Sequence, residues 1–476
     1  MPVTDLTSAS AWELAALIRT KQISPVEIMA HFVDRIQLHN AELNAFVTIT
    51  AEEAMTAAHR AEQAVIDGDP LGALHGVPIA IKDLAETKGI RTTYGSLLFE
   101  DHIPNSDAIH VERIRAAGAI IAGKTNTPEF GWKGTTENLV AGSSRNPWDL
   151  RRTPGGSSGG SAAAVSARLV PLADGSDAGG SIRIPASYCG IYGIKPSCGR
   201  VASDYTGKGG WRALSQNGPL ANTVRDAALL LNVIAGPDGR DALCIPDMPP
   251  DFTAAAENPS VEGLRIAWSP RLDGRPVDPE VARLTESAAL AFEVLGADVE
   301  EATPAVDTEA AVRTWATLTL TDLAVSLGPA IESGRGDVLP PRLLEWVSDA
   351  MTWSATRYAT ALRNLEWHRK AFANFMEDYD LLLLPTMATP PFLIEDPPRS
   401  IDGEDVHPSW GFTPFCTHAN LTGLPAASVP CGFTSGGLPV GLQIIGRHGE
   451  EETVLMASAA FEAAHPWADK RPKRFP

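Results

Sequence analysis

Apolar and polar residues recur along this chain with two different periods, and the change from one to the other outlines the expected elements. Residues 10–66 carry the spacing of amphipathic helices. One helix is expected to begin at residues 24–27 (SPVE), where an N-cap serine, a proline and a glutamate make a capping box. Ile28, Phe32 and Ile36 follow at four-residue intervals and therefore share one face. We expect this N-terminal segment to be a structural layer.

Farther along, short continuous apolar runs replace the helical spacing. The first run, residues 76–81 (GVPIAI), ends at Lys82-Asp83. Uninterrupted apolar strands are typical of a sheet that is covered on both faces. A helical pattern at 108–117 ends at a glycine and leads into a second apolar run at 119–123. The succession of helix, glycine and buried strand predicts an α/β fold.

The rest of the chain continues this alternation. We expect strands at 264–268, near 299, and at 381–385, 426–430 and 440–445, and helices at 279–295, over most of 305–378 and at 451–464. Residues 125–149 and 390–414 are expected to be irregular. A length of 476 residues allows one large domain or two, but no repeat and no low-complexity linker interrupts the chain. This favours a single domain, within which we distinguish residues 1–66, 67–252, 253–415 and 416–476.

Composition and net charge argue against several classes of function. A net charge of −19 argues against direct binding of nucleic acid or of an anionic membrane, both of which attract basic surfaces. The five cysteines form no CxxC or CxxH pair, which argues against a disulfide scaffold or a zinc site and fits a reducing compartment. The first residues lack the pattern of a signal peptide, and no apolar run approaches the roughly 20 residues that span a bilayer. We therefore expect a cytoplasmic protein.

Candidate chemistry gathers in two Gly/Ser clusters, residues 155–161 and 176–181, which are separated by an alanine-rich run and a short apolar strand. A flexible linker would not contain such a buried-type run. A phosphate-binding loop would require G-x-x-x-x-G-K-[ST] or a G-x-G-x-x-G that follows a strand, and neither is present. Residues 155–159 (GGSSG) match G-x-S-x-G, the nucleophile elbow of α/β-hydrolases, with His368, His407, His418 and His448 downstream as nominal bases. That elbow requires a strand directly before it, whereas residues 146–154 have loop character.

Taken as a whole, residues 155–197 (GGSSGGSAAAVSARLVPLADGSDAGGSIRIPASYCGIYGIKPS) resemble the signature of the amidase signature family of serine hydrolases. Further blocks resemble that family in the same order: 76–84 (GVPIAIKDL), 122–127 (AGKTNT), 142–149 (GSSRNPWD), 380–386 (DLLLLPT) and 420–446. The resemblance covers nearly the whole chain and is weakest over 253–375. It implies a single large α/β domain with a central mixed, twisted sheet that helices cover on both faces.

The resemblance also implies the site. Ser181 corresponds to the nucleophile, Lys82 to the base, and Ser157 to the bridging serine, which the family holds in a cis peptide. The family's oxyanion hole corresponds to the backbone amides of Ala178, Gly179, Gly180 and Ser181. Position 178 is often Thr or Ile in relatives, but an amide donor does not depend on the side chain. No cofactor and no metal are implied.

The chemistry accounts for these residue types. A serine hydroxyl needs a base within hydrogen-bond reach, and lysine can act as one only when it is neutral. Burial at the end of a strand lowers a lysine pKa, whereas a nearby carboxylate would raise it, so we expect the Asp83 side chain to point away. Asp177, Arg183 and Ser158 are expected to hold the loops around the site. For Asp177 and Arg183 a surface ion pair is the alternative, and for the whole set the alternative is a packed glycine-rich turn with a lysine that extends to the surface.

The implied reaction is hydrolysis of a carboxamide through an acyl-enzyme, and family members also cleave anilides, carbamates and esters. Five tryptophans are compatible with an apolar or aryl substrate group, but the preferred interpretation is that they pack helices on the sheet: Trp315, Trp346, Trp353, Trp367 and Trp410. We expect a small-molecule amide or carbamate as the partner, no nucleic acid and no membrane, with a homodimer possible. The rival interpretations are the amidotransferase subunit that amidates misacylated tRNA within a larger complex and a non-catalytic binding protein on the same fold.

Overall fold

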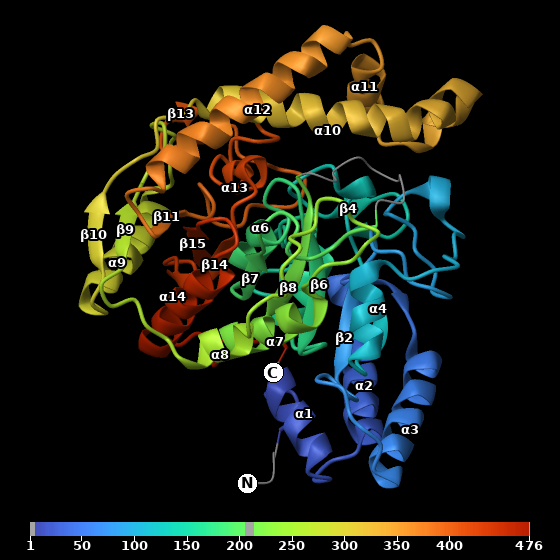
Figure 1. Ribbon diagram of the computed structural model, residues 1–476. Coiled ribbons are helices and arrows are strands. Elements are labelled where there is room, and N and C mark those ends of the chain that lie inside the picture. The colour runs from blue at the N-terminus through green and yellow to red at the C-terminus, as the bar shows by residue number, and fades with distance from the viewer. Residues whose placement is uncertain (1–4, 205–213, 476) are drawn as a thin grey trace.

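An eleven-stranded mixed sheet extends through the molecule in the order β1-β3-β2-β6-β8-β7-β14-β15-β11-β9-β10 (Figure 1). The computed structural model describes residues 5–204 and 214–475. Strand β2 is parallel to β3 and β6, strand β9 is parallel to β10 and β11, and the other neighbouring pairs are antiparallel. The strands are β1 (Phe46–Ile49), β2 (Pro78–Lys82), β3 (Ile120–Thr125), β6 (Leu172–Asp177), β7 (Tyr192–Lys195), β8 (Gln216–Ala221), β9 (Arg265–Trp268), β10 (Asp298–Glu301), β11 (Leu381–Pro385), β14 (Ala426–Phe433) and β15 (Pro439–Gly446). The prediction of one α/β domain around a mixed sheet is confirmed.

Helices lie on both faces of this sheet (Figure 1). They are α1 (Ala11–Arg19), α2 (Pro25–Leu43), α3 (Ala51–Asp67), α4 (Ile109–Ala116), α5 (Gly159–Ser166), α6 (Arg183–Cys189), α7 (Val224–Ile234), α8 (Phe252–Glu257), α9 (Pro279–Val294), α10 (Thr308–Ala330), α11 (Pro341–Ala350), α12 (Ala355–Phe375), α13 (Thr417–Thr422) and α14 (Glu451–Ala464). Helices α10 to α12 lie at the end of the molecule opposite α1 to α3 (Figure 1). No helix in the described ranges is both long enough and apolar enough to cross a membrane.

Strand β2 shows how the two faces are filled. Ile79 and Ile81 belong to the apolar core that also contains residues of α4, α7 and α14. Ala80 points the other way, into the cluster built on the alanines of α5. Successive side chains of a strand point to opposite faces, so apolar residues at every position require cover on both sides. This double cover places Lys82, the last residue of β2, inside the protein.

Most expected elements are present, with three differences. The expected helical region 10–66 contains a strand, β1, which pairs antiparallel with β3. Four residues between two helices show too few periods to be recognised, and the partner strand is far away in sequence. The second difference lies in 390–414, expected as irregular, where a short ribbon is formed by β12 (Ser400–Ile401) and β13 (Glu404–Asp405). A similar ribbon of β4 (Glu137–Asn138) and β5 (Gly142–Ser143) lies within the loop-rich 125–149.

Candidate active site

Lys82 is the buried base candidate, with a side chain only 1% exposed. Its amine lies 2.7 Å from Ser157 Oγ, 3.0 Å from Ser176 Oγ and 3.2 Å from the Ser176 carbonyl oxygen. Burial lowers the pKa of Lys82 to about 7, and the carboxylates of Asp174 and Asp177 oppose this shift only in part. A lysine with such a pKa is substantially neutral near neutral pH, as a general base must be. The lysine does not extend to the surface.

Ser157 lies in the loop before α5, and its peptide bond with Gly156 is cis, as the resemblance implies. The loop that carries Gly156 packs closely against the backbone of Thr135. A Cβ added at Gly156 would lie 2.4 Å from the Thr135 carbonyl oxygen, so only glycine fits there. Loop geometry, not a strand, precedes this serine, and the four nominal histidine bases are absent from the pocket lining at Ser181. The α/β-hydrolase elbow is therefore not formed.

Ser181 lies in the turn that connects β6 to α6, and it lines a pocket. The two serine loops are joined through the backbone, because the Ser158 N–H donates to the Ser181 carbonyl oxygen at 3.1 Å. The Ser158 hydroxyl also donates to the Ser176 carbonyl oxygen at 3.3 Å. Between the side chains of Ser157 and Ser181, both within the described residues, no hydrogen bond is formed. Lys82 and Ser157 are therefore hydrogen-bonded to each other, and Ser181 lies in the adjoining loop.

Asp177 and Arg183 form a buried ion pair with two parallel hydrogen bonds of 2.9 Å, and both side chains are 0% exposed. The surface alternative is therefore excluded. Burial by itself would raise the pKa of Asp177, but the adjacent Arg183 guanidinium outweighs it and holds that pKa well below its usual range. Asn420 completes the cluster by donating to Asp177 Oδ1 at 2.9 Å and accepting from Arg183 at 2.7 Å. Asn420, which comes from α13, opens the family-like block 420–446, but its role in this cluster was not predicted.

This ion pair shapes the loop that carries Ser181. Asp177 Oδ1 accepts the Gly180 N–H at 2.7 Å, and Oδ2 accepts the Ile182 N–H at 3.1 Å. The Gly180 amide, expected as an oxyanion donor, is thus already engaged by a carboxylate. The amides of Ala178, Gly179 and Ser181 have no acceptor among the residues that the structure describes.

A second polar group lies behind the lysine. The backbone N–H of Lys82 donates to Asp174 Oδ1 at 2.5 Å, and His110 Nε2 lies 3.1 Å from Asp174 Oδ2. Sequence reasoning missed both residues and Ser176. The available signal was the alternation of β6, which places Asp174 and Ser176 on the same side of that strand. By contrast, the expectation for Asp83 is confirmed, because its carboxylate accepts from Thr93 at 2.9 Å and points away from the Lys82 amine.

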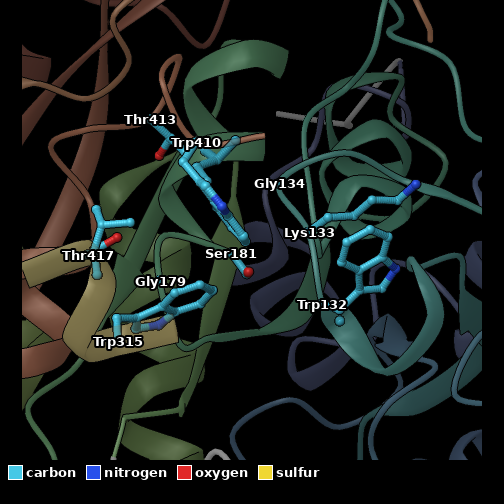
Figure 2. A pocket seen from close by; sticks show the side chains of 12 residues that line it. Trp132, Lys133, Gly134, Gly179, Ser181, Trp315, Trp410, Thr413 and Thr417 are labelled. Atoms are coloured by element: carbon cyan, nitrogen blue, oxygen red, sulfur yellow. The ribbon is translucent and has the colours of Figure 1, made fainter. Parts of the chain in front are cut away.

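Tryptophans form much of the pocket wall at Ser181. Figure 2 shows Trp315 and Trp410 on one side of this serine and Trp132 with Lys133 on the other. The Trp315 and Trp410 rings meet edge to face with centroids 5.0 Å apart, and Trp346 stacks on Trp410 at 5.7 Å. Of the five tryptophans expected from the sequence, two line the pocket, whereas Trp132 was missed. Trp367 is 71% exposed, and Trp353 stacks on Arg357.

Comparisons with known proteins agree with this geometry. The Amidase family model matches residues 27–455. An acylamidase of Rhodococcus erythropolis is 40% identical over 471 residues, which cover 97% of each chain. A glutamyl-tRNA(Gln) amidotransferase subunit of Chromohalobacter salexigens is 38% identical over 487 residues, again 97% of each. The crystal structure of a bacterial aryl acylamidase of the amidase signature family superposes with a TM-score of 0.90 at 33% identity, over 97% of both chains.

The match of the family model over most of the chain and the identity with full-length relatives agree with the buried lysine and the paired serine loops found between β2 and α6. The chain belongs to the amidase signature family.

Proposed function

We propose that this protein is an amidase of the acylamidase type, which hydrolyses a carboxamide C–N bond through an acyl-enzyme on Ser181. The observation that carries the proposal is the Lys82 amine: it is buried, has a pKa of about 7 and lies 2.7 Å from Ser157 Oγ. Maintaining a buried lysine in this state costs the fold free energy, and a base for a serine nucleophile is a use that requires it.

The neutral form of lysine, which a base requires, can make all three contacts of the amine. A neutral amine has two N–H donors and one lone pair. Its two N–H groups donate to the Ser176 hydroxyl and carbonyl oxygens, at 3.0 and 3.2 Å. The lone pair is then left to accept the proton of the Ser157 hydroxyl. Ser176 therefore orients the base toward Ser157.

In the first half-reaction, Ser181 Oγ attacks the carbonyl carbon of the substrate. Its proton passes to Ser157 Oγ as the Ser157 proton passes to Lys82, and the carbonyl oxygen becomes an oxyanion. The ammonium of Lys82 then returns a proton through Ser157 to the nitrogen of the leaving amine, and the C–N bond breaks. In the second half-reaction water attacks the Ser181 ester by the same proton route, releasing the acid and restoring the Ser181 hydroxyl.

The oxyanion would be bound by backbone amides of the loop before Ser181. We assign this task to the amides of Ala178, Gly179 and Ser181, because the Gly180 amide donates to Asp177. Loss of one such donor typically costs about 3–4 kcal/mol of barrier height. The Asp177–Arg183 pair acts indirectly, by fixing the turn in which these amides lie.

The tryptophan walls support an aryl group in the acyl or the amine part of the substrate. Flat apolar rings pack favourably edge to face or offset against other aromatic rings. Proteins similar to this chain include an acylamidase and an aryl acylamidase, which agrees with an anilide as substrate. Carbamates and esters pass through the same tetrahedral oxyanion and are expected as side activities.

The test uses the purified chain alone with 4-nitroacetanilide and follows release of 4-nitroaniline. We expect turnover by the wild type, labelling by a fluorophosphonate probe, and loss of both in Ser181→Ala. Ser166→Ala is the matched control, because it removes a buried serine hydroxyl at the other end of α5, which donates to the Cys189 carbonyl oxygen at 2.7 Å, and it should leave labelling intact. Labelling that persists in Ser181→Ala would assign the nucleophile elsewhere, and no labelling of the wild type would support a non-catalytic binding protein.

The same assay separates the second candidate, the corresponding component of a tRNA-dependent amidotransferase, for which the 38% identity speaks. Such a component works within a complex of several chains. If amide hydrolysis appeared only after the other components were added, the amidase proposal would fail in favour of this one.

A further inference from the structure

Trp315 reaches from α10 to the loop that carries the nucleophile. Its indole N–H donates to the Ala178 carbonyl oxygen at 2.6 Å, across 137 positions of sequence. Both side chains are almost buried, Trp315 at 6% and Ala178 at 8% exposure. A short hydrogen bond in such a dry environment is stronger than one in water.

This hydrogen bond also fixes the orientation of the Gly179 N–H. The Ala178 carbonyl and the Gly179 N–H belong to one planar peptide unit, and in a trans peptide they point in opposite directions. Holding the Ala178 oxygen toward Trp315 therefore turns the Gly179 N–H to the opposite side. This amide has no acceptor among the residues in the described ranges, and Gly179 lines the pocket together with Ser181.

The indole also packs directly against Gly179. A Cβ added at that glycine would lie 3.0 to 3.1 Å from three atoms of the Trp315 ring. The ring and the bare Cα are thus fitted to each other, which limits rotation of the peptide. Trp410 packs edge to face against the Trp315 ring, with centroids 5.0 Å apart, and restrains the indole (Figure 2).

The next peptide is held by a different residue. Asp177 accepts the Gly180 N–H at 2.7 Å. Asp177 therefore lies in the segment that resembles the family signature, whereas Trp315 lies in α10, within the region that least resembles the family.

We propose that Trp315 is a positioning residue for the oxyanion hole: its indole N–H and ring fix the Ala178–Gly179 peptide so that the Gly179 amide faces the carbonyl oxygen under attack. The inference rests on the proposed amidase reaction. Because Trp315 also lines the pocket, the ring that contacts the substrate orients the amide that binds the oxyanion.

The test compares Trp315→Phe with the wild type on 4-nitroacetanilide. Phenylalanine keeps an aromatic ring against Gly179 but removes the N–H donor. We expect kcat to fall about 10- to 100-fold, less than the loss of an oxyanion donor outright, with KM changed less than about threefold. Trp410→Phe makes the same chemical change one ring farther from the loop, and its effect should appear mainly in KM.

A second measurement distinguishes a misplaced oxyanion-hole amide from a general loosening of the pocket. An aryl trifluoromethyl ketone forms a hemiketal with Ser181, whose new oxyanion needs the same amides. Trp315→Phe should weaken this adduct by the factor by which kcat/KM falls, while the affinity for a non-reactive aryl carboxylic acid stays within about twofold. Equal weakening of both ligands, or an unchanged kcat, would overturn the role of Trp315.

Trp315→His guards against a folding defect, because it keeps a ring N–H in a smaller side chain. Recovery of part of the lost kcat relative to Trp315→Phe supports the hydrogen bond, and a histidine variant no better than phenylalanine contradicts it. If the wild type showed no Ser181-dependent turnover, the proposed function would fail. Full activity of Trp315→Phe in an active enzyme would refute this inference alone.

Discussion

Replacing Lys82 by methionine should change the stability of the protein in a strongly pH-dependent way. Burial lowers the pKa of Lys82 from 10.5 to about 7 in the folded protein, whereas the unfolded chain has the ordinary value. Between these two values the unfolded state binds the extra proton, so Lys82 makes the fold less stable there, and the cost shrinks as pH rises. Below about pH 7 the cost is complete, and near pH 10.5 it disappears.

The magnitude follows from the shift. A difference of about 3.5 pKa units corresponds to about 5 kcal/mol at low pH, to about 4 kcal/mol at pH 7 and to about 1 kcal/mol at pH 10. Methionine has a similar shape and no charge, so Lys82→Met removes this cost. It also leaves the hydroxyls of Ser157 and Ser176 without their amine partner, an opposing term that does not depend on pH. The free energy of unfolding of the variant relative to the wild type should therefore fall by about 3 kcal/mol between pH 7 and pH 10.

Denaturant unfolding of both proteins at the two pH values measures this difference. Thr285→Val is the control, since it removes a buried hydroxyl that donates to the Val281 carbonyl oxygen in α9 and carries no charge. Its effect should be equal at both pH values. A pH-independent effect of Lys82→Met would mean that the lysine is charged in the folded protein, and the reasoning about the base would be refuted. The kinetic counterpart is a kcat/KM for 4-nitroacetanilide that rises with pH through about 7.

Two further substitutions test how the loops are held. Arg183→Met leaves the Asp177 carboxylate buried without its cation, so we expect a loss of about 3–5 kcal/mol in the free energy of unfolding, and a loss below about 1 kcal/mol would contradict a structural role for the pair. Gly156→Ala places a Cβ 2.4 Å from the Thr135 carbonyl oxygen and should abolish turnover, whereas Gly239→Ala, where nothing lies within 4 Å, should leave the rate within about twofold of the wild type; equal rates of the two variants would refute the steric argument.

Much of the fold follows from local patterns. The run 76–81 predicts a doubly covered strand because every residue is apolar, and β2 is such a strand. The capping box at 24–27 marks the start of α2 to the residue. Strand β1 escaped prediction because a four-residue strand is specified mainly by its partner, β3, and not by its own sequence.

The residues of the site also fall into those that the sequence predicted and those that it did not. Lys82, Ser157 and Ser181 were predicted as site residues because they lie in long motifs whose order and spacing resemble a family. The pairing of Asp174 with His110, and of Asn420 with the predicted Arg183, was not identified in this manner. Each of these pairs joins segments that are distant in sequence, and single polar residues on a helix or strand carry no local signal of what they will meet.

The sequence by itself determined the class of fold, the candidate residues Lys82, Ser157 and Ser181, and the presence of a lysine at the end of a buried strand. Only the tertiary structure decided that burial lowers the pKa of this lysine to about 7, that Asp177 accepts the Gly180 amide, and that the Trp315 indole donates to the Ala178 carbonyl oxygen. The reason is physical. A pKa depends on how much water and which charges surround a group, and the direction of an amide depends on which acceptor or donor holds its peptide. Both are set by contacts between segments that the chain brings together only on folding.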